Sequence, residues 1–440
     1  NFSDAPPFRD LGNIVAIGVL ASFVYCVALL PALMLGLPVR VKATHNKSVQ
    51  VMDRLADFVV TRRRPVLWVM ALLVIGLIAL VPRNQLNDEF VKYFDDSVQF
   101  RIDTDFATSN LTGIYNIAYS LESGESGGIS EPAYLNKLEE FANWFRQQPE
   151  VLHVNSLSDT LKRLNQNLHA DQPEWYRIPR RRELAAQYLL LYEMSLPYGL
   201  DLNNQINVDK SASKLDVTLK SVSSNRVIAL EESAQQWLQE NAPPAMQVNG
   251  ASPAIMFSHI GARNIHSMLG GTTVALLLIS FILVFALRSL RIGLISIIPN
   301  LVPAAMAFGL WGLLVGQVGL ALSVVTGMTL GIVVDDTVHF LSKYLRARRE
   351  KSLSPADAVR YAFHTVGTAL WTTSIVLIAG FLVLTGSPFE LNSGMGLLTA
   401  ITIGLALLAD FLLLPTLLMT LDKKENYVSS LVADPAESVV

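Results

Sequence analysis

The sequence contains a single cysteine, Cys26, and lacks the common short motifs of enzymes. One cysteine excludes a disulfide framework and a cysteine-based metal site. The nucleophile elbow G-x-S-x-G, the phosphate-binding P-loop and the zinc motif HExxH are all missing from the chain. The sequence therefore predicts a protein that is not an enzyme and that holds no cofactor and no metal.

Charge is also scarce. Charged residues make up 16% of the chain against 51% hydrophobic residues, and the net charge is −3. This balance argues against a nucleic-acid partner and is typical of a membrane protein with a substantial soluble part. The sequence begins at Asn1 without a methionine or a signal peptide, and an apolar run follows almost at once. We therefore expect a piece of a longer polypeptide.

Long apolar runs are what the sequence has in abundance. Seven stretches have the length and hydropathy of membrane-spanning helices: Leu11–Leu37, Pro65–Val81, Met268–Leu287, Ile292–Val315, Gly319–Leu341, Thr365–Thr385 and Gly394–Leu421. Short loops on one side of these spans carry Lys and Arg, whereas Gly316–Val318 and Gly386–Ser393 carry neither. By the positive-inside rule the basic side is cytoplasmic, so the long segment between the second and third spans is expected outside.

The spans predict an α-helical membrane bundle with one external domain. The expected segments are 1–37 (the last helix of a first repeat), 38–64 (a cytoplasmic linker), 65–81 (a span), 82–265 (the external domain), 266–421 (five spans) and 422–440 (a cytoplasmic tail). Within the external segment, alternating apolar residues predict strands near Gly113–Leu121, Val151–Leu157, Lys214–Lys220 and Met246–Asn249, and amphipathic periodicity predicts helices near Glu131–Gln148 and Asn225–Asn241.

This element order predicts an α+β, ferredoxin-like external domain, because it reads β-α-β, an insertion, then β-α-β. The insertion covers about 158–208 and is expected to be helical around Arg181–Ser195. Its YLLLYEM run is apolar enough to pack in the core, to line a cavity or to contact a partner.

Two parts of the chain resemble each other. Near the start, PPFRDLG leads to ASFVYCVALLPALM, and near the end, SPFELNSG leads to LLADFLLLPTLLM. Pro31 then corresponds to Pro415 and Phe8 to Phe389. Parallel repeats are typical of transporters with two homologous halves, so the first helix is expected to be the counterpart of the last. The alternative is a chance likeness between two leucine-rich helices.

The stretch GMTLGIVVDDTVHFLSKY holds the chemically most informative residues. Asp335 and Asp336 follow an apolar run, and His339 lies one helical turn further on. At about 100° per residue, the three side chains can share one face of a helix. Gly327 and Gly331 continue this face as a small-residue groove for close helix packing. Because an ionisable group costs about 2.5–3.5 kcal/mol near the bilayer centre, we expect the aspartates to face a bundle interior.

Alternatives remain for each of these residues. The helix could end at Val334, which would leave both aspartates among wet lipid headgroups. His339 could relay protons or only pack. Thr372 and Thr373 on the next helix are candidate hydroxyl partners, although such hydroxyls often bond back to their own helix. Asp410 is either a secondary relay or a buried hydrogen bond between helices.

These segments together resemble the C-terminal half of a resistance-nodulation-division (RND) superfamily exporter of the MMPL-like and hopanoid-exporter-like branch. The likeness is carried by SLRIGLISIIPNLVPAAMAFGLWGLL, GMTLGIVVDDTVHFLSKYLRARRE, GTALWTTSIVLIAGFLVLTGSPF and LLADFLLLPTLL. It implies a twelve-helix protein with two external porter domains that is driven by proton entry, with the proton site here on Asp335 and Asp336. In the drug-efflux branch this helix offers a basic partner instead. This sequence has an aspartate pair on that helix, and the difference from the drug-efflux branch implies a more symmetric transporter or a proton site concentrated in this half.

The leading hypothesis is therefore proton-driven export of a hydrophobic or amphiphilic substrate, such as a lipid, by a protein of the bacterial inner membrane. Two carboxylates this close do not both ionise cheaply at low dielectric, so one is expected to bind a proton from outside and release it inside. The expected partners are membrane lipids, the substrate and the missing N-terminal half, with a homo-oligomer left open. A Patched-like lipid or sterol sensor and an RND-related motor for protein export are the alternatives.

Overall fold

The computed structural model of this 440-residue chain describes residues 6–36, 47–197 and 199–422. Most of the predicted tail 422–440 and part of the predicted linker 38–64 therefore lie outside the described residues. The chain divides into two compact units: a bundle unit, Asn1–Leu86 with Arg263–Val440, and a sheet unit, Asn87–Ala262.

The bundle unit is almost entirely helical. Its elements are α1 (Pro6–Val24), η1 (Tyr25–Leu29), α2 (Leu30–Gly36), α3 (Lys47–Thr61), α4 (Arg63–Ile78), η2 (Val81–Arg83), β1 (Gln85–Leu86), the later part of α10 (Pro253–Ala286), α11 (Leu290–Ile295), α12 (Ile297–Leu314), β5 (Gln317–Val318), α13 (Leu320–Arg349), α14 (Pro355–Ala362), η7 (Phe363–Gly367), α15 (Thr368–Val383), η8 (Leu384–Gly386), α16 (Glu390–Leu408), η9 (Ala409–Leu413) and α17 (Leu414–Leu421). Among the described residues, seven helical stretches are long and apolar enough to cross a membrane, which confirms the seven predicted spans.

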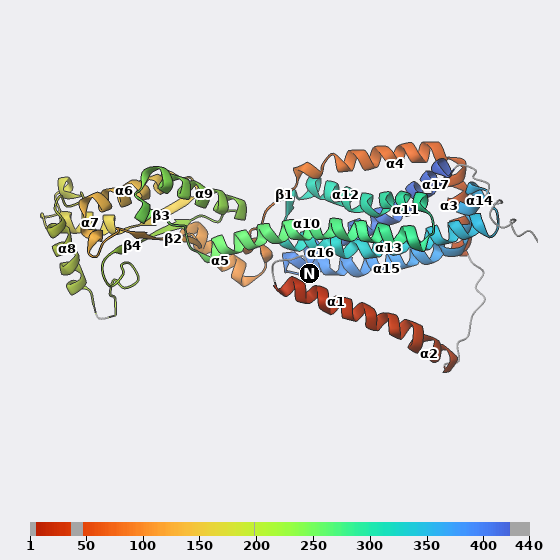
Figure 1. Cartoon of the computed structure of the whole chain (residues 1–440), viewed down its shortest axis with the longest axis horizontal. Helices are drawn as coiled ribbons and strands as arrows, with labels where there is room; N and C mark the ends of the chain where they lie inside the picture. Colours follow the sequence, from red (N-terminus) through yellow and green to blue (C-terminus); the bar gives the residue numbers. More distant parts are fainter. Residues whose placement is uncertain (1–5, 37–46, 198, 423–440) are drawn as a thin grey trace, which may run out of the picture. The chain divides into compact units, whose positions relative to one another are not determined.

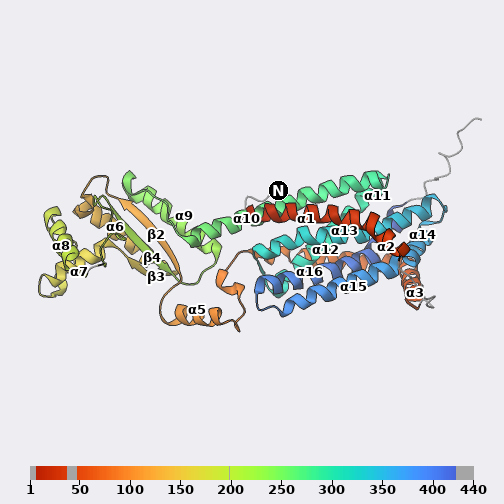
Figure 2. The same ribbon diagram turned by 90° about the horizontal axis from the view of Figure 1, so that it is seen from below.

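Helix α16 is central to the packing of the bundle unit. It contacts α12, α13 and α15 along much of their length, and Figures 1 and 2 show these four helices side by side. A second close contact joins α4 to α12, where a Cβ added at Gly309 would lie 1.8 Å from the carbonyl oxygen of Leu77. Only glycine permits this approach, and the Asn84 amide strengthens it by donating to the carbonyl of Phe308 at 2.7 Å.

The two repeated segments share a structural irregularity. In the first, the N–H of Leu30 donates to the carbonyl of Tyr25, and the π-turn η1 ends two residues before Pro31. In the last, the N–H of Leu414 donates to the carbonyl of Ala409, and η9 ends two residues before Pro415. A proline lacks an N–H and crowds the carbonyl four residues earlier, and a π-turn is one way to accommodate it. The matching geometry supports the internal repeat over a chance likeness.

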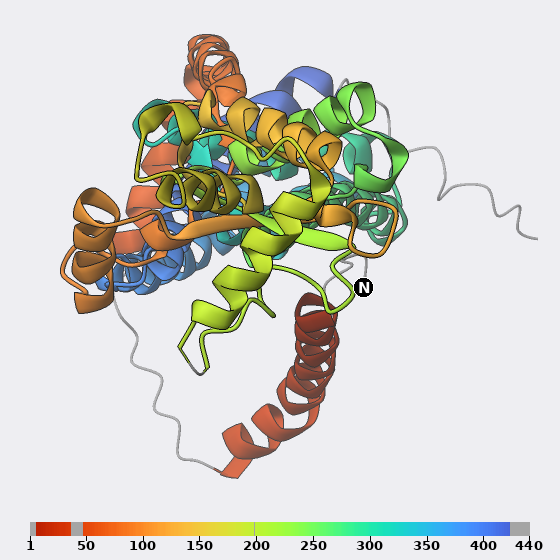
Figure 3. The same cartoon turned by 90° about the vertical axis from the view of Figure 1, so that its left-hand side faces the viewer.

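The sheet unit contains a three-stranded antiparallel sheet with helices on one face. Its elements are η3 (Phe90–Tyr93), α5 (Gln99–Asn110), β2 (Tyr115–Glu122), η4 (Gly128–Ser130), α6 (Pro132–Arg146), β3 (Val151–Asn155), α7 (Leu157–Asn167), η5 (Pro173–Trp175), α8 (Arg182–Ser195), β4 (Ala212–Leu219), α9 (Ser224–Asn241), η6 (Pro244–Met246) and the beginning of α10. The strand order is β2-β4-β3. Figure 2 shows this sheet, and Figure 3 shows the same unit with its insertion helices α7 and α8 nearest the viewer.

The core of the sheet unit forms between the sheet and the helices α6 and α9. Alternate residues of β4, namely Leu215, Val217 and Leu219, are fully buried, as expected for a strand with one covered face. From α6, Phe141 stacks on Trp237 of α9 with ring centroids 5.1 Å apart. The helices predicted on either side of the insertion are thus the ones that cover the sheet.

The fourth strand predicted at Met246–Asn249 is wrong. Residues Pro244–Met246 form a 3-10 turn, and the segment approaches the sheet through an isolated antiparallel bridge between Ala251 and Ala118. Two prolines precede the segment and remove backbone donors that a strand needs. Gly250 then passes so close to the sheet that an added Cβ would lie 2.7 Å from Ile117, which leaves no room for an alternating side chain.

Candidate proton-coupling site

Both aspartates of the predicted site lie within one continuous helix. α13 extends unbroken from Leu320 to Arg349, so the alternative in which the helix ends at Val334 is wrong. Its last turn carries Arg346, Arg348 and Arg349, which complement the negative end of the helix dipole and favour this late end.

Asp336 points into the bundle. It is 8% exposed, and its Oδ2 atom lies 3.1 Å from Oγ of Ser374, a completely buried residue of α15. The same Ser374 Oγ lies 2.8 Å from the carbonyl oxygen of Leu370, one turn earlier in its own helix. The serine hydroxyl therefore lies between a carboxylate of α13 and a backbone acceptor of α15.

This arrangement depends on the protonation state of Asp336. A hydroxyl carries one proton, so it donates to the carboxylate or to the Leu370 carbonyl, but not fully to both. A protonated Asp336 instead donates to Ser374 Oγ, and the hydroxyl proton is then free for the carbonyl of Leu370. With Asp336 protonated, Ser374 Oγ accepts a hydrogen bond from the carboxyl group and donates one to the Leu370 carbonyl. With Asp336 ionised, the carboxylate and the carbonyl compete for the single hydroxyl proton.

A second buried carboxylate, that of Asp410, is bonded to the residue that directly follows Asp336. The hydroxyl of Thr337, directly after Asp336, donates to Oδ1 of Asp410 at 2.9 Å. Asp410 is 1% exposed and belongs to the π-turn η9, and its Oδ2 atom has no hydrogen-bond partner among the described residues. Asp336 and Thr337 together join α13 to both α15 and η9.

Asp335 and His339 point the other way. Their side chains are 71% and 57% exposed, and Oδ1 of Asp335 lies 3.5 Å from Nε2 of His339. The prediction that all three ionisable residues share one face is therefore wrong, because adjacent residues differ by about 100° around a helix and Asp336 turns inward. Asp335 and His339, four residues apart, do share a face.

The predicted glycine groove lies on this exposed side of α13. Gly327, Gly331, Asp335 and His339 recur every four residues along it, and we call these four residues the open face. A Cβ added at Gly327 would lie 3.4 Å from Thr272 Oγ1 of α10, whereas one added at Gly331 would have no described atom within 4 Å. Within the described residues, the groove is in contact with another helix only at its Gly327 end.

The two predicted threonine partners bond to their own helix. Thr372 Oγ1 donates to the carbonyl of Thr368 at 2.8 Å, and Thr373 Oγ1 lies 3.0 Å from the carbonyl of Ala369. The hydroxyl that reaches the carboxylate is that of the next residue, Ser374, which the sequence reasoning missed. Thr337 was also missed, although it adjoins the aspartate pair.

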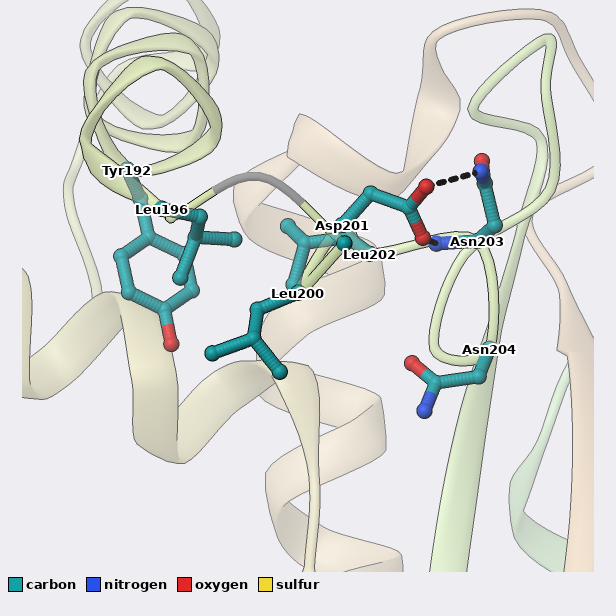
Figure 4. Close-up of a pocket in the computed structure, with 8 residues that line it drawn as sticks. Tyr192, Leu196, Leu200, Asp201, Leu202, Asn203 and Asn204 are labelled. Atoms are coloured by element: carbon teal, nitrogen blue, oxygen red, sulfur yellow. Dashed lines mark hydrogen bonds between the residues drawn. The ribbon is translucent and has the colours of Figure 1, made fainter.

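Part of the insertion lines a surface cavity in the sheet unit. In the YLLLYEM run, Tyr188 and Leu189 are buried in the core, so core packing holds for the first residues of the run. Tyr192 lines a cavity of about 580 Å³, opposite a loop in which Asp201 accepts hydrogen bonds from Asn203 (Figure 4). These hydrogen bonds satisfy the carboxylate within its own turn, so this cavity shows no side chain prepared for chemistry.

Two comparisons with known proteins agree with this architecture. The family model of the MMPL family matches residues 202–430, more than half of the chain. The "Putative membrane protein MJ1562" of Methanocaldococcus jannaschii is 27% identical over 161 residues, which cover 37% of this chain and 40% of that protein. The chain thus matches less than half of the length of this curated relative. The matched region carries the whole of α13, α15 and η9, and on this evidence the chain belongs to the MMPL family of the RND superfamily.

Proposed function

We propose that the chain is part of a proton-driven exporter of hydrophobic or amphiphilic substrates, with Asp336 as its principal proton site. MMPL proteins are membrane transporters, and the observation that carries the finer proposal is the pair of carboxylates in the bundle interior. Asp336 and Asp410 are 8% and 1% exposed, and among the described residues of the bundle neither forms an ion pair with Lys, Arg or His. Burial of an unpaired charge is strongly unfavourable, so buried acids of this kind are suited to binding protons.

Protonation of Asp336 would act on the contact between α13 and α15. The ionised form takes the Ser374 hydroxyl away from the Leu370 carbonyl, and the protonated form returns it. Two hydrogen-bonding states of one contact can therefore favour two positions of α13 relative to α15, which is the kind of two-state element that alternating access needs. Each proton entering through about 100 mV contributes about 2.3 kcal/mol to driving it.

The open face of α13 has a place in this proposal. Gly331, Asp335 and His339 are uncovered, although they lie on a helix apolar enough to cross a membrane. Ionisable side chains are unfavourable against lipid, so we propose that an N-terminal half of the kind expected from the family resemblance packs against this face. Asp335 and His339 then become a second, shared part of the proton pathway, and Asp410 serves as a secondary site.

The orientation and location follow from the same reasoning. By the positive-inside rule, the basic loops of the bundle favour an outside location for the sheet unit. A porter domain is supported by its ferredoxin-like element order, in which the fourth strand is reduced to one bridge. We propose a location in the bacterial inner membrane with the sheet unit on the periplasmic side. Lipids are the proposed substrate class.

The test is Asp336→Asn in the full-length protein, reconstituted in liposomes. We expect the infrared carbonyl band of a protonated carboxylic acid to weaken and transport driven by a pH gradient to fall at least about tenfold, as expected when about 1.4 kcal/mol of coupling is lost. Glu390→Gln, at the beginning of α16 and outside the site, is the matched control. Undiminished gradient-driven transport by Asp336→Asn would refute the assignment.

A further inference from the structure

Helix α12 contains a buried amide, that of Asn300, between two prolines. Asn300 is 1% exposed, and neither its Nδ2 atom nor its Oδ1 atom has a hydrogen-bond partner among the described residues. Buried polar side chains are almost always hydrogen-bonded, because a buried donor or acceptor without a partner destabilises the fold. The amide therefore points to a role in another arrangement of the bundle.

Asn300 does not repair the break that the prolines make in its own helix. Pro303 lies inside α12 and lacks an N–H, so the carbonyl of Pro299 loses its usual helical donor. The Asn300 side chain is one residue from that carbonyl, but its Nδ2 atom donates to none of the described residues. The nearest local explanation for a buried amide is thus excluded.

The backbone around Asn300 packs against the segment that carries Asp410. Val302, two residues after Asn300, belongs to one apolar cluster with Met70 of α4 and Ala409 of η9, and α12 also contacts η9 directly. Asp410 follows Ala409 in the chain, and its Oδ2 atom is likewise buried without a partner among the described residues. The free amide and the free carboxylate oxygen therefore come from backbone segments that pack together.

Both side chains lie on the side of α13. Asn300 is seven residues before Ala307, which is almost two whole turns of helix, so the two residues share one face of α12. On that face, Ala307 packs in a buried cluster with Val325 of α13. Asp410 reaches α13 through its bond with Thr337. The amide and the carboxylate thus face a common interior region.

Few ionisable groups surround this region. α12 and α17 carry no titratable side chain, and those of α4 and α16 are confined to the first two residues of each helix. From α13, Asp336 lies next to Thr337, whereas Asp335 and His339 are exposed. Among the described residues of these helices, no cation is placed to bind Asp410 in preference to an amide.

An amide is suited to a carboxyl group that gains and loses a proton. Its Nδ2 atom donates to an ionised carboxylate, and its Oδ1 atom accepts from a protonated one. We propose that Asn300 is a positioning residue of the proton-coupling site, and that it binds Oδ2 of Asp410 when the bond from Thr337 to Asp410 opens. Asp410 then has one partner in each of two states, Thr337 on α13 and Asn300 on α12. This inference rests on the proposed export function, because that function requires two states of the bundle.

The first experiment measures thermal unfolding of the purified chain in detergent at pH 7, with Asn300→Leu introduced into two backgrounds. In the unchanged chain the amide has no partner, so leucine, which has the same branching without polar atoms, should raise the unfolding midpoint. In Thr337→Val the donor to Asp410 is gone and Asn300 replaces it. The same substitution should therefore lower the midpoint in that background.

Thr399→Val is the matched control for this change of sign. Thr399 is completely buried in α16, and its hydroxyl also has no partner among the described residues. Its replacement should raise the midpoint by similar amounts in both backgrounds. An effect of Asn300→Leu with the same sign and size in both backgrounds would overturn the proposal.

The second experiment connects the pair to transport. It uses the full-length protein in liposomes, with the dye pyranine inside to report proton movement. Asn300→Leu should slow transport driven by a pH gradient at least about fivefold, the lower end of the usual coupling between two states, and Thr399→Val should not. This measurement decides the matter where Thr337→Val fails to fold, because full transport by Asn300→Leu also overturns the proposal.

The two proposals fail in different ways. Undiminished transport by Asp336→Asn refutes the proposed function, whatever Asn300→Leu does. Lost transport in Asp336→Asn together with full transport in Asn300→Leu refutes this inference alone.

Discussion

Thr337 and Asp410 join two helices deep in the bundle unit through a hydrogen bond of 2.9 Å. The two residues are 73 positions apart in the chain, and both are almost completely buried. The bond ties the helix that carries the aspartate pair to a π-turn, which is an irregular segment with weaker backbone restraints than an α-helix. The helix that carries Asp336 is therefore anchored to an irregular part of its neighbour.

Replacement of Thr337 by Val should destabilise the bundle. The change keeps the shape but leaves both carboxylate oxygens of Asp410 without a donor, which costs about 1–3 kcal/mol for a buried polar group. We expect a lower midpoint of thermal unfolding in detergent. Thr329→Val is the matched control, because Thr329 is buried on the same helix but bonds to the carbonyl of Val325. Equal decreases of the unfolding midpoint in the two variants would show that the bond to Asp410 stabilises the bundle no more than a bond within the helix does.

Replacement of Ser374 by Ala should alter proton coupling. Without the hydroxyl, Asp336 loses its partner in both protonation states, so the pH dependence of transport should move away from that of the unchanged protein while the chain still folds. Thr373→Ala is the control, because that hydroxyl bonds to its own helix. A pH profile of Ser374→Ala that coincides with that of the control would remove Ser374 from the pathway.

Two glycines should respond in opposite ways to alanine. Gly309→Ala places a methyl group against the carbonyl of Leu77, so α4 must move from α12 and thermal stability should fall. Gly331→Ala meets nothing within the described residues, and alanine is the better helix former, so thermal stability of this chain should rise slightly. In the full-length protein, the larger Gly331→Leu should impair assembly if the other half packs on the open face. A full-length Gly331→Leu protein of unchanged stability and activity would contradict that packing.

The sheet unit should lose local stability in acid. Burial acts to raise the pKa of Asp159, but hydrogen bonds from Ser156 and Lys162 and the charge of Arg146 outweigh it and hold that pKa below its ordinary value. The stabilisation from this group is then fully present above about pH 4, the ordinary value for aspartate, and is lost as the pH falls through the lowered pKa.

Hydrogen exchange of peptides from β3 and α7, corrected for the intrinsic effect of pH on exchange, provides the measurement. Protection should fall between about pH 4 and pH 2.5 in the unchanged chain. Asp159→Asn removes the titrating group, so its loss of protection over that interval should be smaller. An identical loss in both proteins would assign the acid sensitivity to other carboxylates.

The spans and most sheet-unit elements could be predicted from the sequence, because hydrophobic length and alternation are properties of a segment by itself. The failures concern which neighbour a residue meets. A run of three hydroxyls, Thr372 to Ser374, gives no sign of which one faces α13, and the aspartate pair gives no sign of which member turns inward. Both answers depend on the rotation of a helix within the bundle, which packing against α15 and α16 decides.

The wrong prediction of a strand at Met246–Asn249 has a similar explanation. Met246–Asn249 alternates like a strand, but the backbone before it is stiffened by prolines, and Gly250 passes too near Ile117 for regular pairing. Local pattern predicted an edge strand where tertiary crowding permits a single bridge.

The π-turns before Pro31 and Pro415 also bear on the origin of the chain. Each turn accommodates one residue more than an α-helix would hold, at the same distance from its proline. Two separate insertions at equivalent places are a less economical history than one insertion in a single ancestral helix that was later copied. On that history Asp410 and Cys26, which occupy the same position of the two turns, are descendants of one residue, and the acid is a point at which the two copies diverged.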